Sequence, residues 1–299
     1  MMYMLWRQTV RNLKIYFKDK ANVFFSLLAS LIVLGLYLLF LKDTQVDALL
    51  SALEAQGAEG GKDTVRAFAD AWMLSGVLSC ACITVPLCAS GVIVQDKRRG
   101  ICDDLRASPV PEWLPPAAYF CSVVLAGVLL ALVVLAVCLV WLAAAGSWFL
   151  TAADVFALLG NVLLSVLSSS MLLVFVVGFL RSEGAFTGLN VILGTVIGFL
   201  IGAYMPLSMF PQGVRYFTLF VPGSYSAGIF RHFFLRGALE ELSSLSAPFA
   251  DALAEQYATE LDFFGTTLGA GAMALVLAGT AVLFAAANLA AAAVRTARR

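Results

Sequence analysis

Six long apolar stretches without a single Asp, Glu, Lys, Arg or His constrain the fold of this 299-residue chain more than any other feature. A helix needs about 20 apolar residues to cross the hydrocarbon core of a membrane, and it satisfies its own backbone hydrogen bonds there. Every stretch reaches that length, so the sequence predicts an all-α membrane protein with six transmembrane helices. The predicted spans are residues 22–41, 71–94, 119–145, 155–180, 185–205 and 263–294.

The charged residues, 13% of the chain, are divided unequally between the two sides that these spans define. If the N-terminus lies in the cytoplasm, most Lys and Arg residues fall in inner segments and most Asp and Glu residues in outer ones. The positive-inside rule then places both termini in the cytoplasm. We therefore expect a multi-pass protein of the cytoplasmic (inner) membrane of a prokaryote.

The first 21 residues combine two helical patterns. The apolar series is Trp6, Val10, Leu13 and Phe17, and the basic series, one residue further on, is Arg7, Arg11, Lys14 and Lys18. This spacing predicts a basic amphipathic helix lying on the inner membrane surface. The alternative is a plain positive anchor that orients the first span.

Two outer segments differ in character. Residues 42–70 carry glycines among acidic residues, and we expect them to form a solvated loop. Within residues 206–262, the apolar stretches 205–220 and 225–235 are too short to cross the membrane and are broken by prolines. They predict a re-entrant helical hairpin dipping into the outer leaflet before the last span. The alternative is a helical cap on the outer surface.

Signatures of an enzyme are missing from the sequence. It contains no G-x-x-x-x-G-K-[ST] loop, no H-E-x-x-H motif and a single histidine, His232. The predicted spans also lack the ionisable groups that ion-driven transporters place in the membrane. We therefore expect no catalytic residue, metal or cofactor in this chain, and no nucleic-acid partner. Any transport would draw its energy from elsewhere.

The fifth span carries Gly194, Gly198 and Gly202, two overlapping G-x-x-x-G steps on one helix face. Small residues at this spacing let another helix approach closely. That helix belongs either to the same chain or to a second copy across a dimer interface.

The inner loop, residues 95–118, contains residues that start and stop a short helix, which a simple linker does not need. A charged run ends at Gly100, residues 103–107 have the composition of a short helix, and Ser108-Pro109 stops it because proline disfavours helix before it. A short charged helix between two spans is suited to docking on a cytosolic partner. The alternative is a positive inner loop without a partner.

This loop resembles the inner loop of type-2 ABC transporter permeases, in which a charged run precedes Gly, an acidic residue, Leu and Ser/Thr-Pro. The matching residues are Gly100, Asp103, Leu105, Ser108 and Pro109. The stretch from residue 205 to Arg231 is similar to the outer re-entrant helices of that family. Arg99 stands where the family often has Glu, which indicates a more basic docking surface.

The resemblance implies one transmembrane permease domain over residues 1–299. Two permease chains, a homodimer in preference to a heterodimer, would form the pathway, and separate cytosolic subunits would hold ATP and Mg²⁺. The ATPase-docking residues would be Arg99, Gly100, Asp103, Leu105, Ser108 and Pro109. In the fifth span, Asn190 and Phe199 would contact the substrate. The resemblance implies export, and an uncharged pathway favours a lipophilic or amphipathic cargo such as a drug, lipid or peptide.

Two other classes of function compete with this interpretation. A membrane-embedded lipid-modifying enzyme would need convergent polar or ionisable residues at one depth, and the sequence offers none. A non-transporting scaffold would contact membrane lipid as well, but it would not bind an ATPase.

Overall fold

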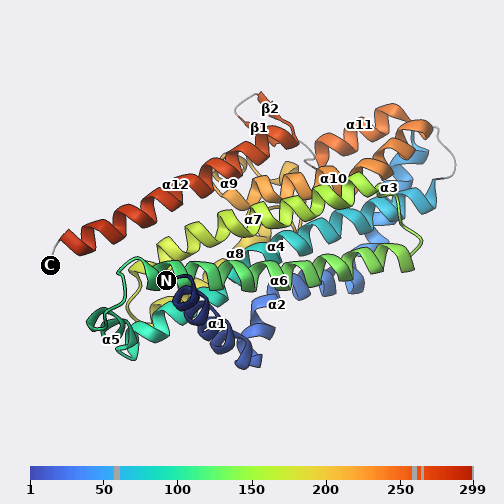
Figure 1. Ribbon diagram of the computed structural model, residues 1–299. Coiled ribbons are helices and arrows are strands. Elements are labelled where there is room, and N and C mark those ends of the chain that lie inside the picture. Colours follow the sequence, from blue (N-terminus) through green and yellow to red (C-terminus); the bar gives the residue numbers. More distant parts are fainter. Residues whose placement is uncertain (57–60, 258–260, 264–265, 298–299) are drawn as a thin grey trace.

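The computed structural model describes residues 1–56, 61–257, 261–263 and 266–297 as an elongated bundle of helices (Figure 1). The first half contains α1 (Met2–Lys18), α2 (Lys20–Leu36), a π-helical turn η1 (Tyr37–Leu41), α3 (Lys42–Glu54), α4 (Lys62–Arg98), α5 (Ile101–Ala107) and α6 (Leu114–Ala144). The second half contains α7 (Ala152–Phe179), α8 (Glu183–Leu200), a 3₁₀ turn η2 (Leu207–Met209), α9 (Gln212–Thr218), α10 (Pro222–Leu245), α11 (Ala247–Gln256), β1 (Leu261–Phe263), β2 (Thr266–Leu268) and α12 (Ala270–Ala297).

Six helical segments of the described chain are long and apolar enough to cross a membrane. They are Lys20–Glu54, Lys62–Arg98, Leu114–Ala144, Ala152–Phe179, Glu183–Leu200 and Ala270–Ala291. The predicted all-α membrane class and the number of spans are therefore confirmed. α1, α5 and the C-terminal end of α12 lie at one end of the bundle, called the inner end below (Figure 1). The opposite, outer end carries α3 and α11.

The expected outer loop at residues 42–70 is wrong for the described part, because most of it is helical. The first span continues through η1 into α3, and α4 already begins at Lys62. Val46, Leu49 and Leu53 recur at helical spacing and are buried, so this amphipathic stretch gains more from packing on α4 than from solvation. The glycine-containing residues 57–60 of the expected loop lie outside the described residues.

Two other span boundaries also differ from expectation. The fifth span ends at Leu200 because Gly202, with a φ of +69°, closes the helix: Ala203 N–H bonds Gly198 O (2.7 Å) and Gly202 N–H bonds Phe199 O (3.0 Å). This pair of bonds is the Schellman pattern of a helix end. The sixth span starts at Ala270, since 261–263 and 266–268 form a short antiparallel hairpin that pairs Phe263 with Thr266.

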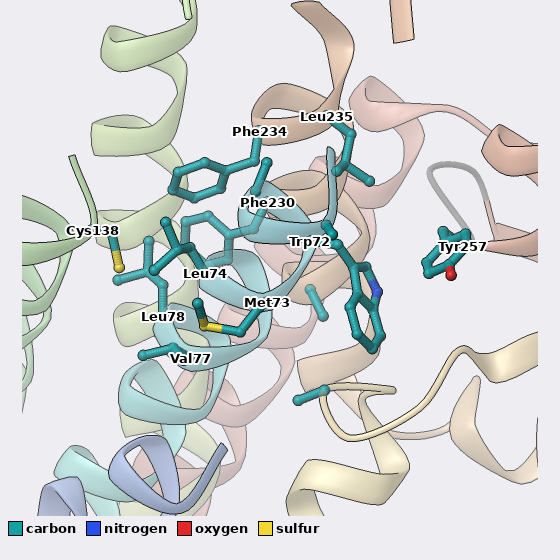
Figure 2. Packing of buried hydrophobic residues seen from close by; sticks show 14 of the residues in the cluster. Trp72, Met73, Leu74, Val77, Leu78, Cys138, Phe230, Phe234, Leu235 and Tyr257 are labelled. Atoms are coloured by element: carbon teal, nitrogen blue, oxygen red, sulfur yellow. The ribbon is translucent and has the colours of Figure 1, made fainter. Parts of the chain in front are cut away.

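α4 is the central helix of the bundle, and its membrane-length window is entirely buried. Its sequence is apolar on every side and rich in Gly, Ala, Ser and Cys, so neighbouring helices can pack closely around it. α2, α6, α7 and α10 surround it (Figure 1). In the outer half, Trp72 packs edge to face on Tyr257 (5.3 Å between ring centroids), while Phe230 and Phe234 of α10 fill the space beside Leu78 (Figure 2).

Residues 206–257 descend into the bundle and return to its outer end. Ser208 Oγ donates to Gln256 O near the outer end, whereas Ser226 Oγ lies 2.6 Å from Ser165 Oγ, at the middle of α7. α10 then runs back outward until Arg236 meets Asp154 in the first turn of α7 (3.0 Å). The re-entrant hairpin stays a prediction, as do its alternative, a cap on the outer surface, and the surface location of α1.

Candidate functional site

The candidate docking site is the unit that joins α4 to α6 at the inner end. α4 stops at Arg98, and Gly100 turns the chain with a φ of +75°, a conformation that favours glycine. α5 follows over Ile101–Ala107, and Ser108 Oγ donates to Leu105 O (2.7 Å) where the helix ends. The short helix predicted at 103–107 and its stop at Ser108-Pro109 are therefore present, with a start at Ile101.

The six predicted docking residues lie together in this turn–helix–turn unit, but they differ in exposure. Arg99, Asp103 and Pro109 are exposed, whereas Gly100, Leu105 and Ser108 are half-buried. The exposed three can contact a partner directly. The buried three shape the unit: Gly100 supplies the turn, Ser108 caps the helix, and Leu105 faces an inner groove described below. Docking of an ATPase at these residues stays a prediction.

A buried polar network fixes the position of this unit. Asp96, near the end of α4, is 1% exposed and accepts two hydrogen bonds from Arg11 of α1, at 2.7 and 2.9 Å. Tyr119 of α6 donates to the same carboxylate (2.6 Å), and Cys102 Sγ of α5 lies 3.8 Å from the Tyr119 hydroxyl. Hydrogen bonding to Asp96 raises the pKa of Arg11, so the guanidinium stays charged. The network thus joins α1, α4, α5 and α6.

The basic run after Asp96 ties α4 to the α7–α8 connection. Lys97 Nζ donates to Gly178 O (2.6 Å) and Leu180 O (3.0 Å), the carbonyls at the end of α7, where a cation is favourable. Arg98 forms an ion pair with Glu183 at the start of α8, and both side chains are largely exposed. These contacts connect the inner end of α4, directly before the turn to α5, with α7 and α8.

The two predicted substrate-path residues lie on different sides of α8. Asn190 is half-buried against α4, with its amide nitrogen 3.4 Å from Cys88 Sγ. Phe199 is 45% exposed, and its ring packs on Tyr204 (4.7 Å). The structure does not bring the two residues together on one surface. The face of α8 that carries Val191, Ile192 and Phe199 is exposed in the single chain.

The three predicted packing glycines have three different surroundings. A Cβ at Gly194 would meet nothing within 4 Å, whereas at Gly198 it would clash with the Tyr204 ring. Gly202 closes the helix, as described above. Gly198 and Gly202 therefore serve the local fold at the end of α8. Contact of Gly194 with a second chain stays a prediction.

Sequence reasoning missed two groups of buried ionisable residues. Asp96 and Asp70 were assigned to loops, although each is buried at one end of α4. Arg231 of α10 is 1% exposed and donates through Nη2 to Ile201 O and Gly202 O (2.8 Å to the latter), the carboxyl end of α8. A charge inside the apolar stretch 225–235 was the signal for Arg231, since such a charge is rarely left in lipid.

Metal-binding geometry is missing from the described part of the chain: it holds no group of three or more His, Cys, Asp or Glu side chains arranged for an ion. His232 is half-buried and packs edge to face on Phe233, 5.1 Å between ring centroids.

Replacing Gly100 by Ala tests the turn before α5. Nothing lies within 4 Å of the added Cβ, so the expected loss of about 1 kcal/mol comes from the left-handed backbone alone. Gly184→Ala is the matched control, because that glycine lies in the first turn of α8 and has equally open surroundings. Thermal unfolding in detergent measures both variants. Equal midpoints for the two would contradict the assigned role of Gly100.

Comparison with known proteins adds one match. A family model described as ABC-2 type transporter matches residues 1–235, which include the α4–α6 unit and most of α10 up to Leu235. No curated protein and no solved structure matches the chain significantly.

Proposed function

Because this chain belongs to the ABC-2 type transporter family, whose membrane subunits work with an ATP-binding partner, we propose that it is the permease subunit of an ATP-driven exporter. The chain is a multi-pass membrane protein and a permease component of an ABC transporter. Our proposal adds the direction of transport, the docking site and the cargo.

The observation that carries the proposal is that α5 is exposed on one side and anchored to a buried ion pair on the other. Its first turn exposes Asp103 and Asp104, while the helix base is joined through Cys102 and Tyr119 to the buried Arg11–Asp96 pair. A partner that pushes on α5 would therefore move α1, α4 and α6 together. Rigid-body movement of this kind is one of the standard ways in which an inward-open state changes to an outward-open one.

The remaining parts of the proposal concern the assembly. A separate cytosolic subunit would hold ATP and Mg²⁺ and dock around Asp103, so this chain would bind no cofactor itself. A second copy of this chain would complete the pathway, and the exposed apolar face of α8 supports such pairing. Both termini would lie in the cytoplasm of a prokaryote, consistent with α1 and the C-terminal end of α12 lying at the same end of the bundle (Figure 1).

The cargo would be lipophilic or amphipathic. The exposed apolar side chains of α8 include Val191, Ile192, Val196 and Phe199, and this face suits an apolar cargo better than an ion. A lipid-modifying enzyme or a scaffold would instead show no dependence on an ATPase, and the following experiment separates these classes.

Co-expression with candidate ATP-binding subunits from the same organism, followed by purification and an ATPase assay in lipid, tests the proposal. We expect a complex, and we expect Asp103→Lys to lower the hydrolysis supported by the permease about tenfold, as loss of a docking contact of about 1.4 kcal/mol would. Asp251→Lys is the matched control, an equally exposed charge reversal at the outer end on α11.

Either of two outcomes would overturn the proposal: a purified chain that binds no ATP-binding subunit, or a complex in which Asp103→Lys and Asp251→Lys behave alike.

A further inference from the structure

A second feature of the inner end lies behind the proposed docking helix. A groove with a volume of about 720 Å³ lies between the inner halves of α7 and α12, the start of α6, and the α5 unit. This volume is typical of sites that hold a small organic molecule. α8, which carries the predicted substrate path, contributes nothing to the lining that the structure describes. The groove is therefore separate from that path.

The walls of the groove are apolar. α7 supplies Val174 and Phe175, and α12 supplies Ala285 and Leu289. Asn288 also lines it, but both donors of its amide are used, on Met171 O (3.0 Å) and Phe284 O (2.7 Å). Walls of this composition favour an apolar occupant over ordered water.

One end of the groove is polar. Lys97 and Glu112 line it there, together with Trp113, which is 50% exposed. A cation, an anion and an amphipathic ring at the end of a bundle of membrane helices correspond to the headgroup layer, where Trp is enriched. Lys97 Nζ already donates to Gly178 O and Leu180 O, so a headgroup would lie against this polar end without replacing those bonds.

We propose that this groove binds a phospholipid of the inner leaflet, with one acyl chain between α7 and α12 and the headgroup beside Lys97 and Glu112. Acyl chains are the apolar molecules present in bulk at this depth. A peptide would leave backbone groups unpaired in the same space, which is unfavourable in the hydrocarbon region. The site is distinct from the cargo path and goes beyond the proposed function.

The bound chain also supports α5. Leu105 and Cys102 of α5 and Val110 of the following turn line the groove, while Asp103 is exposed and does not line it. An acyl chain in the groove therefore fills the space behind the docking helix. Without it, these side chains lose contacts, and α5 loses one of the surfaces that hold it in place.

A photoactivatable phosphatidylethanolamine with a diazirine on its acyl chain identifies the site. The purified chain is reconstituted in vesicles of phosphatidylethanolamine and phosphatidylglycerol, illuminated, and digested for mass spectrometry. We expect the label to concentrate on peptides covering residues 171–179 and 285–291. Label spread evenly over all lipid-facing helices, α8 included, would overturn the proposal.

Matched variants make the labelling specific. Ala285→Trp and, from the facing wall, Val174→Trp fill the groove, and each is expected to lower the labelling of these peptides about tenfold, which corresponds to ordinary overpacking. Ala286→Trp is the control, because Ala286 directly follows Ala285 but is exposed and does not line the groove. Unchanged labelling in both groove variants would contradict the site.

Hydrogen exchange of residues 101–107 tests the support of α5. We expect about tenfold faster exchange after delipidation and in Ala285→Trp, with no change in α11 at the outer end. Equal exchange of α5 with and without lipid would remove this part of the proposal. Neither measurement uses an ATPase, so failure here leaves the transport proposal standing, and failure of the transport proposal leaves the lipid site standing.

Discussion

Asp96→Asn is expected to lower the free energy of unfolding by about 2–4 kcal/mol, because it removes the charge from a buried carboxylate that accepts three hydrogen bonds. The loss stays below that of a fully buried pair, since Arg11 is 36% exposed and can turn to water. Thermal unfolding in detergent gives the magnitude. Hydrogen exchange should also show α1 losing protection, because Arg11 is its hydrogen-bonded link to α4.

Glu183→Gln provides the matched control for Asp96. It breaks the ion pair with Arg98, two residues further along α4, but both partners of that pair are largely exposed. Its expected effect is within about 0.5 kcal/mol, as is usual for surface ion pairs. A similar loss in the two variants would show that burial and the geometry at Asp96 are not the cause.

Gly202→Ala is expected to destabilise the chain by about 2–4 kcal/mol. The left-handed backbone alone accounts for about 1–2 kcal/mol, and the new Cβ would lie 2.8 Å from Leu207 Cγ and 2.9 Å from Arg231 Nη2. Relief of that contact would displace the guanidinium that caps α8. Gly188→Ala, within the same helix and with nothing near its Cβ, is expected to stabilise by up to about 1 kcal/mol.

Thermal unfolding of the two glycine variants should therefore shift in opposite directions. Destabilisation by both, or by neither, would contradict the assignment of Gly202 as the residue that ends the helix.

Local signals in the sequence account for what could be predicted. The length of the uncharged apolar stretches specifies the six spans. Gly100 and Ser108-Pro109 specify the turn–helix–turn unit, because these residues restrict the backbone at their own positions. α3 could not be predicted in this way: its polar residues read as a loop, and only the burial of Leu49 and Leu53 on α4 makes the helix favourable. Fifth-span glycines were read as one packing stripe, although Gly202 ends the helix.

The network of the candidate site is a harder case. Arg11 and Asp96 are separated by 85 positions in the sequence, so no local pattern joins them. Each also sits in a basic or mixed run that the positive-inside rule explains without any contact. The same holds for Arg231, whose partners are the backbone carbonyls of a helix end and carry no side-chain signature at all.

The two buried carboxylates of α4 restrict how this helix can move. Asp70 accepts hydrogen bonds from Tyr37 (3.1 Å) and Lys42 (3.2 Å) at the outer end, as Asp96 does from Arg11 and Tyr119 at the inner end. They are about 39 Å apart along the helix, close to the thickness of a bilayer with its headgroups. Sliding α4 by one turn in either direction would draw a carboxylate toward the hydrocarbon and away from its donors. The thickness of the membrane thus fixes the axial position of α4, which leaves tilting and rotation with its neighbours as the movements open to it.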